Sequence, residues 1–361
     1  MPRSALAALL LIGLGAAGCG IAGSATIDAP VAVYVSLPLT GPRGPDGRDA
    51  ADGARLALEH ARSKAGAIQV RARFLDDAKG KAWDPVAVGA NARQAVQDSS
   101  AAAYIGELDS EPTRASVPIT NDAGLVQVSP GAGGVDLTAP AAGYPDSPDR
   151  YRPSGSASFA RTVPADDVVA DAAALWASEL GATAAAVTSD GSTFQDLAAA
   201  EFKSAAAEHG IQVSQGKPPS KVAVASDAGA SAVYEPGLGR LSVYGNAPQT
   251  LQVSAELDPT SLPGKHFAGQ FGQRFHRSAG PYAAYGYEAM ELVLQAIRGA
   301  GTDASSFRDN LRHGVIGAHR DGTVLGSYAI TSEGDTTECL IQRYRIAGAT
   351  AQPLAAPCPA R

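Results

Sequence analysis

A chain of 361 residues, 45% of them hydrophobic and 18% charged, has the composition of a globular protein with room for two or more domains. This composition excludes an intrinsically disordered chain, which would contain fewer apolar residues. The net charge of -7 provides no basic face for phosphate groups, so it argues against nucleic acid as a partner.

The first residues have the pattern of an export signal. Arg3 precedes a short apolar run at residues 5–14, and small residues follow it. This run is shorter than the roughly 20 residues that span a bilayer, so we interpret residues 1–18 as a signal peptide. The sequence Ala16-Ala17-Gly18-Cys19 is similar to a bacterial lipobox, which predicts lipidation of Cys19. The alternative is a plain secretory signal followed by an incidental cysteine.

Three cysteines are an odd number. If Cys19 carries lipid, Cys339 and Cys358 remain, and two cysteines of an exported chain can form a disulfide. Two unpaired thiols outside the cytoplasm are the alternative.

From Val31 onward, strand and helix patterns alternate. Near-continuous apolar runs are typical of buried parallel strands, and helices of about 12 residues between them indicate βαβ units. Asp84 and Pro85 mark one helix start, because aspartate caps a first turn and proline fits its first position. The first half is expected to contain strands at 31–35, 70–74, 103–105 and 126–128, with helices at 48–61, from 85, and from about 110.

A second series of elements follows a Pro- and Ser-rich segment at 144–156. One strong helix is predicted at 282–301, because its apolar residues share a face and glycines end it. The segments 325–330 and 340–346 resemble a β-hairpin with its turn at 333–335. The remaining elements expected here are a helix at 166–180, a strand at 184–187 and a helix at 197–209.

Patterns typical of catalysis, metals and cofactors are absent from the sequence. The six histidines are scattered, and no Walker loop or Gly-x-Ser-x-Gly motif occurs. We therefore predict no enzyme, no metal and no cofactor. The acid pairs Asp76-Asp77 and Asp166-Asp167 are interpreted as solvated ends of loops.

Several short motifs share an order and spacing that resemble one family, the branched-chain amino acid receptors of ABC transporters. These motifs are Ser36-Leu37-Pro38-Leu39-Thr40-Gly41-Pro42, Gly53-Ala54-Arg55-Leu56-Ala57, Tyr104-Ile105-Gly106-Glu107-Leu108-Asp109-Ser110, Val128-Ser129-Pro130, the run Phe159 to Asp166, and the run Tyr282 to Met290. The resemblance implies the type I periplasmic binding protein fold: two doubly wound, parallel-sheet α/β lobes joined by a three-strand hinge. Ligands bind beyond the carboxyl ends of parallel strands, so a site in the cleft between the lobes is expected.

The same resemblance implies a division of the mature chain. A tether at 19–27 would lead to lobe 1, formed by residues 28–162 and 280–319. Lobe 2 would take residues 163–279 and 321–347, and residues 348–361 would form a C-terminal tail.

By motif, lobe 1 would contact the ligand through two loops. Ser110 stands at a hydroxyl position that holds a carboxylate in relatives, although it also suits the cap of its helix. The other loop offers Ser129, Ala132 and Gly133, where relatives usually carry a threonine at the position of Gly133. Two more contacts are placed by the resemblance, and they are Asp46 in lobe 1 and Phe194 in lobe 2. For Phe194 a core position is the alternative.

Two departures bear on the ligand. Glu107, Asp109 and Glu111 surround Ser110, and unless they face solvent they favour a cationic or neutral solute over a free carboxylate. Lobe 2 is also short, because only residues 235–240 separate two strands that a parallel crossover of a dozen residues would join in relatives. Lobe 2 is therefore either pared down or unable to close on a solute.

The resemblance implies a lipid-anchored receptor outside the cytoplasm that delivers an amino-acid-like, amide or cationic solute to an ABC permease. The alternative is a degenerate lipoprotein that keeps the fold as a sensory or interaction module.

Overall fold

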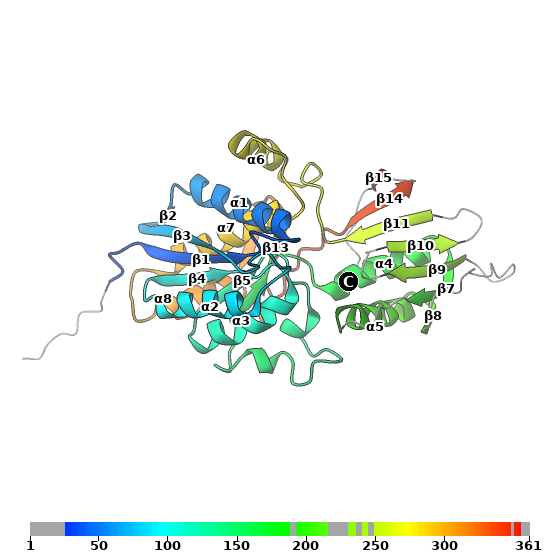
Figure 1. Cartoon of the computed structure of the whole chain (residues 1–361), viewed down its shortest axis with the longest axis horizontal. Coiled ribbons are helices and arrows are strands. Elements are labelled where there is room, and N and C mark those ends of the chain that lie inside the picture. The colour runs from blue at the N-terminus through cyan, green and yellow to red at the C-terminus, as the bar shows by residue number, and fades with distance from the viewer. Residues whose placement is uncertain are drawn as a thin grey trace, which may run out of the picture.

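The computed structural model describes residues 26–187, 193–215, 230–235, 240–244, 249–347 and 350–354. It contains two α/β lobes that lie side by side along the long axis of the molecule (Figure 1). Among these residues no helix is long and apolar enough to cross a membrane. The two-lobed fold class expected from the motifs is confirmed.

Lobe 1 is built on a six-stranded sheet in the order β2-β3-β1-β4-β5-β6. All pairs are parallel except the short β2–β3 hairpin. The strands are β1 (Val31–Leu37), β2 (Lys64–Ala65), β3 (Ile68–Asp76), β4 (Ala101–Ile105), β5 (Val126–Ser129) and β6 (Phe159–Arg161). The helices are α1 (Gly44–His60), α2 (Pro85–Gln97), α3 (Ser110–Asp122), α7 (Ala283–Ala300) and α8 (Phe307–Val315).

The strands and helices predicted for this half are present, although α1 begins at Gly44, earlier than the predicted start at 48. The buried run of β1 lies in the middle of the sheet, as expected for a strand covered on both faces. The predicted start of α2 is also correct, because the Asp84 carboxylate accepts hydrogen bonds from the N–H groups of Val86 and Ala87 at 2.9 and 3.0 Å.

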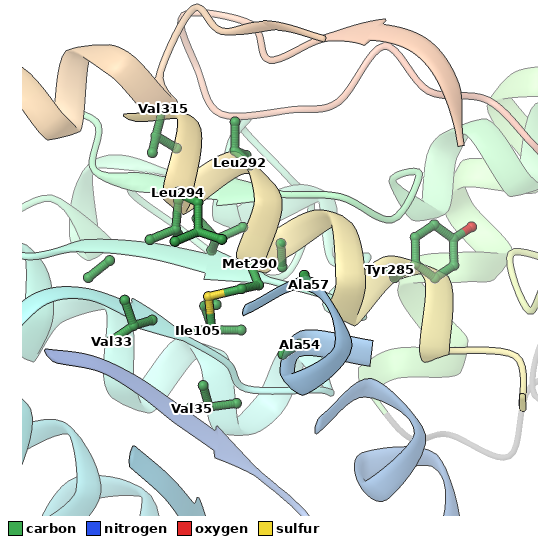
Figure 2. Close-up of a cluster of buried hydrophobic side chains, with 14 of the residues drawn as sticks. Val33, Val35, Ala54, Ala57, Ile105, Tyr285, Met290, Leu292, Leu294 and Val315 are labelled. Atoms are coloured by element: carbon green, nitrogen blue, oxygen red, sulfur yellow. The ribbon is translucent and has the colours of Figure 1, made fainter. Parts of the chain in front are cut away.

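The core of lobe 1 lies between the sheet and the crossing of α1 with α7. Figure 2 shows Met290 of α7 directed at Ile105 of β4, with Val33 and Val35 of β1 beside it. The two helices approach closely because each presents a glycine. A methyl group on Gly53 would lie 1.9 Å from the carbonyl oxygen of Ala283, and one on Gly286 would lie 2.0 Å from that of Ala50.

Lobe 2 has a seven-stranded sheet in the order β15-β14-β11-β10-β9-β7-β8. Only β8-β7-β9 is parallel, and the rest of the sheet is antiparallel. Its strands are β7 (Ala182–Val187), β8 (Gln212–Gln215), β9 (Ala230–Glu235), β10 (Arg240–Tyr244), β11 (Gln249–Ser254), β14 (Gln342–Ala347) and β15 (Thr350–Leu354), and α4 (Asp166–Glu179) packs beside α5 (Thr193–Glu208).

This sheet corrects the expectation of a doubly wound parallel sheet in both lobes. The short link at 235–240 joins β9 to β10 as antiparallel neighbours, and an antiparallel pair needs only a tight turn. The missing crossover helix is therefore a change of topology and leaves no break in the sheet.

Two segments expected in lobe 2 pack with lobe 1. Phe267 and Phe271 of α6 (Phe267–Phe275) lie in the core of lobe 1, although the sequence placed residues 163–279 in lobe 2. Leu325 and Tyr328, from the hairpin β12 (His319–Thr323) and β13 (Gly326–Ala329), lie in the same core. The expected pairing of 325–330 with 340–346 is wrong, because β13 pairs with β12 while β14 pairs with β11 and β15.

Three segments cross between the lobes. Among the described residues they follow β6, β11 and β13, and the first two contact Tyr285 in the first turn of α7. The Tyr285 carbonyl accepts a hydrogen bond from the Thr162 hydroxyl at 3.2 Å, and its phenol donates to the Ala255 carbonyl at 2.8 Å. In the third crossing, Asp335 lies 2.9 Å from Nε of Arg161. The crossings are thus tied to one another close to the cleft.

Candidate functional site

The loops after β4 and β5 lie together at the carboxyl edge of the lobe 1 sheet. Ser110 is the first residue of α3, and the residue at the cap position is Asp109, which makes no capping side-chain bond. The Ser110 hydroxyl oxygen instead accepts a hydrogen bond from the Gly134 N–H at 2.9 Å, so it joins the two loops. Among the described residues the Ser110 hydroxyl is an acceptor in this bond and donates no hydrogen bond of its own.

Ser129 and Ala132 hold the loop after β5 in place through hydrogen bonds within the protein. Both are fully buried. The Ser129 hydroxyl donates to the Glu107 carbonyl at 2.6 Å and accepts from the Ala132 N–H at 2.8 Å, and the Ala132 carbonyl accepts from Arg161 at 3.0 Å. The polar groups that the resemblance would offer to a ligand at these two positions are therefore occupied within the protein.

The three acids around Ser110 have different surroundings. Glu107 is buried in lobe 1, where its carboxylate accepts hydrogen bonds from Tyr104 at 2.6 Å and Ser116 at 2.5 Å, and burial raises its pKa to about 7. Glu107 therefore faces the interior of lobe 1 and not solvent. Glu111 pairs with Arg114 at 2.9 Å.

Asp109 belongs to a charged cluster on the lobe 1 wall, which we call the Arg43 cluster: Arg43, Asp46, Asp109, Tyr282 and Glu256. The guanidinium of Arg43 lies 2.6 Å from Asp46 and 2.9 Å from Asp109, and stacks over Tyr282 at 5.4 Å from the ring centroid. Glu256 belongs to the second crossing, and burial and Asp46 raise its pKa. Burial also raises the pKa of Asp46. Three carboxylates thus share one cation.

Lobe 2 reaches this edge through Asp166, at the first position of α4. Its N–H donates to the Gly133 carbonyl at 2.8 Å, and a methyl group on Gly133 would lie 2.2 Å from its Oδ1. The carboxylate therefore fills the space that a side chain at position 133 would take. Burial raises the pKa of Asp166 to about 6, although Arg161 and Arg114 act in the opposite direction.

Asp166 was missed by sequence reasoning, which interpreted Asp166-Asp167 as a solvated loop end. A signal was present, because glycine at 133 and a carboxylate at a helix start are complementary once the lobes meet, but the pairing is visible only in three dimensions. Phe194 stands near the start of α5 on the opposite lobe, and its side chain lies outside the described residues.

Asp77, also interpreted as a solvated loop end, is buried at 1% exposure. Neither of its carboxylate oxygens has a hydrogen-bond partner among the described residues, and burial raises its pKa to about 8. Its neighbour Asp76 binds the loop that follows β1. The Asp76 carboxylate accepts hydrogen bonds from the N–H of Leu39 and the hydroxyl of Thr40.

Asp77→Asn is expected to change how stability depends on pH. A carboxyl whose pKa is raised by folding contributes full stability below its unfolded pKa near 4, and that stability is lost as pH rises toward about 8. At pH 8–9 the free energy of unfolding of the variant, relative to the wild type, should therefore be higher than at pH 5 by about 2 kcal/mol or more. Urea unfolding at pH 5 and pH 8.5 measures this, and an equal difference at both pH values would contradict it.

The described residues line cavities large enough for small molecules. One of about 350 Å³ opens beside the Arg43 cluster, lined by Glu256, Asp258, Gly280, Pro281 and Tyr344 among others. A larger one of about 510 Å³ lies at the opposite end of lobe 1, among Thr26–Val31 and Arg308. We favour the smaller cavity as part of the ligand site, because it adjoins the crossings, whereas the larger one lies at the amino ends of the strands.

Among the described residues, no group of three His, Cys, Asp or Glu side chains could hold a metal ion. Cys339 packs against the core of lobe 2. Cys19 and Cys358 lie outside the described residues, so the expected lipidation and the expected disulfide stay predictions.

Comparisons with known proteins agree with this architecture. The sequence model of a family described as periplasmic binding protein matches residues 30–234. No curated protein sequence matches the chain at a significant level. A leucine-binding protein from Thermotoga maritima has 18% identity and a TM-score of 0.67, with 91% of this chain and 99% of that chain covered.

Two other solved structures show the same fold. An ABC-transporter substrate-binding protein from Desulfitobacterium hafniense in complex with leucine has 17% identity and a TM-score of 0.65, covering 90% of this chain and 100% of that one. A solute-binding protein from R. palustris in complex with benzoate has 16% identity and a TM-score of 0.66, with 92% of this chain and 98% of that chain covered. The motifs, the two lobes and the matched family model together show that this chain belongs to the periplasmic binding protein family, with the fold of the branched-chain amino acid receptors of ABC transporters.

Proposed function

We propose that this protein is an extracytoplasmic receptor that holds a small amine-bearing solute between its lobes and delivers it to an ABC permease. The observation that carries the proposal is the placement of Asp166 of lobe 2 against Gly133 of lobe 1, beside Ser110. A carboxylate at the junction of two lobes offers a counter-charge for an ammonium group, and lobe closure would then depend on the ligand.

The charges of the Arg43 cluster on lobe 1 favour a solute whose other groups, apart from the amine, are neutral or cationic. In the Arg43 cluster, Asp46, Asp109 and Glu256 share the single charge of Arg43, and burial keeps the pKa of Asp46 and Glu256 raised. A ligand carboxylate placed there would meet like charge in a half-buried site, which is unfavourable. An amide, a cationic amino acid or a polyamine would instead relieve the excess of negative charge.

The roles follow from these contacts. Ser110 would donate its hydroxyl proton to the ligand, and Asp166 would accept from the amine. Asp109, together with Asp46, would select against a free carboxylate. Ser129 and Ala132 would act indirectly, by holding the Gly133 loop in place, and Phe194 stays a proposed contact from lobe 2.

Calorimetric titration with leucine, leucinamide and 1,4-diaminobutane tests this ranking. We expect the amide and the diamine to bind at least about tenfold more tightly than leucine, a difference of about 1.4 kcal/mol. Asp109→Asn should narrow the gap between leucine and its amide, whereas Asp166→Asn should weaken all three. Leucine binding at micromolar affinity, with the amide and the diamine silent, would contradict the proposal.

A second candidate is a module that keeps the fold for sensing or protein interaction without a transported ligand. It is favoured by the internal hydrogen bonds of Ser129 and Ala132, which occupy the polar groups at these positions. No measurable binding of leucine, leucinamide or 1,4-diaminobutane would support it.

We further propose that Cys19 carries lipid and anchors the protein to the outer face of the cytoplasmic membrane. The reason is the short apolar segment followed by small residues and cysteine. Cys19→Ser should leave an unprocessed precursor that incorporates no labelled fatty acid. Equal labelling of the variant and the parent protein would refute the anchor.

A disulfide between Cys339 and Cys358 is proposed on the same basis as above, that two cysteines remain in an exported chain. Closing a loop of about 20 residues stabilises by roughly 3 kcal/mol on the chain-entropy model. Alkylation of the denatured, non-reduced protein should then find no free thiol.

A further inference from the structure

Glu338 is a buried carboxyl in the third crossing between the lobes. It lies between β13, which packs with lobe 1, and β14, which belongs to the lobe 2 sheet. Its exposure is 4%. Oε1 accepts a hydrogen bond from the N–H of Leu340, whereas Oε2 has no partner among the described residues.

The residues that follow Glu338 divide between the two cores. Cys339 and Ile341 pack with the core of lobe 2, while Leu340 packs with that of lobe 1. The chain therefore changes lobe within a few residues of this carboxyl. Rotation of one lobe against the other would alter the backbone here, because this segment is one of the three that cross between the lobes in the described part of the chain.

Glu338 also lies close to the residue that ties the other crossings. Tyr285 contacts Thr162 of the first crossing and Ala255 of the second. The charge of Glu338 contributes, after burial, to raising the pKa of the Tyr285 phenol. Tyr285 is the titratable group that faces Glu338 from α7. Three residues before Glu338, Asp335 is already paired with Arg161 and Thr138.

No cation compensates the carboxyl. Among the described residues no Lys, Arg or His forms an ion pair with Glu338, and the polar groups that act on it are the N–H groups of Leu340 and Cys339. Burial therefore dominates and raises its pKa to about 8. Below that pH the carboxyl is neutral. Above it the carboxylate is charged and buried with Oε2 unpaired, which is unfavourable in free energy unless Oε2 becomes hydrated.

We propose that Glu338 makes the hinge sensitive to protons: neutral Glu338 holds the lobe arrangement seen here, and ionised Glu338 favours an arrangement that brings Oε2 to water. The hinge behaviour belongs to the fold, and only its consequence, that ligand capture varies with pH, rests on the proposed function. Glutamine at this position would mimic the neutral carboxyl, because its amide keeps an acceptor for Leu340 and carries no charge.

Small-angle X-ray scattering of the ligand-free protein between pH 6 and pH 9.5 tests the proposal. In the wild type we expect the radius of gyration and the interlobe peak of the distance distribution to shift with a midpoint near pH 8. In Glu338→Gln this shift should be lost. The matched control is Asp77→Asn, since Asp77 has a pKa raised to about 8 as well but follows β3 in lobe 1 and belongs to none of the three crossings. That variant should keep the wild-type shift.

A second measurement covers the case in which Glu338→Gln does not fold. Carbon NMR of labelled glutamate carboxyls in the wild type should find one that titrates near pH 8, in step with the scattering change. The proposal is overturned if scattering does not change over this range, if Glu338→Gln retains the change, or if no glutamate carboxyl titrates near pH 8. None of these results depends on a ligand, so they leave the proposed function untouched.

Discussion

Arg161→Ala is expected to lower the free energy of unfolding by about 3–5 kcal/mol, because it leaves buried partners of a charged group unpaired. The Arg161 side chain is fully buried where the first crossing leaves lobe 1. It donates to the carbonyls of Ala132 and Gly134 at 3.0 Å each and to the Thr138 hydroxyl at 2.6 Å, and it pairs with Asp335 at 2.9 Å. Urea unfolding would measure the loss.

Arg152→Ala is the matched control for this prediction. Arg152 also pairs with an acid of the third crossing, lying 2.7 Å from Glu333, but the Glu333 side chain is 53% exposed. Such surface pairs contribute about 1 kcal/mol or less. Equal losses in the two variants would show that Arg161 does not hold the Gly133 loop and the crossing together.

Gly286→Ala should be the most damaging single-methyl change in the described part of α7. The added carbon would lie 2.0 Å from the Ala50 carbonyl oxygen, and backbone atoms of two packed helices cannot move aside as a side-chain end can. Overpacking of a core costs about 1–3 kcal/mol, and a clash with backbone belongs at or above the upper end. A lower midpoint of thermal unfolding would report it.

Gly299→Ala on the same helix is the control. Nothing lies within 4 Å of a methyl group at that position. Replacing an exposed helical glycine with alanine should stabilise by about 0.5–1 kcal/mol. If both variants were equally stable, α1 and α7 would not be held in contact through their glycines.

The parts of the fold that depend on local pattern were predictable. The apolar run at Val31 gave a central strand, and Asp84-Pro85 gave a helix start, because each depends on a few neighbouring residues. The glycines of the family motifs also have a physical meaning, since Gly53 and Gly286 permit the contact of α1 with α7.

Features that depend on distant residues were not predictable. Asp166 meets Gly133, and Arg161 meets Asp335, only after the lobes have formed. Sequence position likewise placed Glu107 beside Ser110, whereas its side chain turns into lobe 1 toward Tyr104. Neighbours along a chain can point to opposite sides, so spacing alone could not decide which acids face the cleft.

The change of topology in lobe 2 had a visible signal with two interpretations. The link at 235–240 was too short for a parallel crossover, which left either a reduced lobe or one that no longer closes. The antiparallel pairing of β9 with β10 shows that the sheet remains continuous, so the shortening does not by itself remove a wall of the cleft.

The most direct test of the central claim is a thermal-shift screen of the mature protein against amino acids, their amides and polyamines. A solute held between the lobes stabilises the folded state by mass action, by about 2.7 kcal/mol at a hundredfold excess over its Kd. We expect the largest rise in Tm from an amide, a cationic amino acid or a polyamine, and we expect Asp166→Asn to abolish that rise. No rise with any of these classes, or an equal rise in Asp166→Asn, would contradict an amine-binding cleft closed by Asp166.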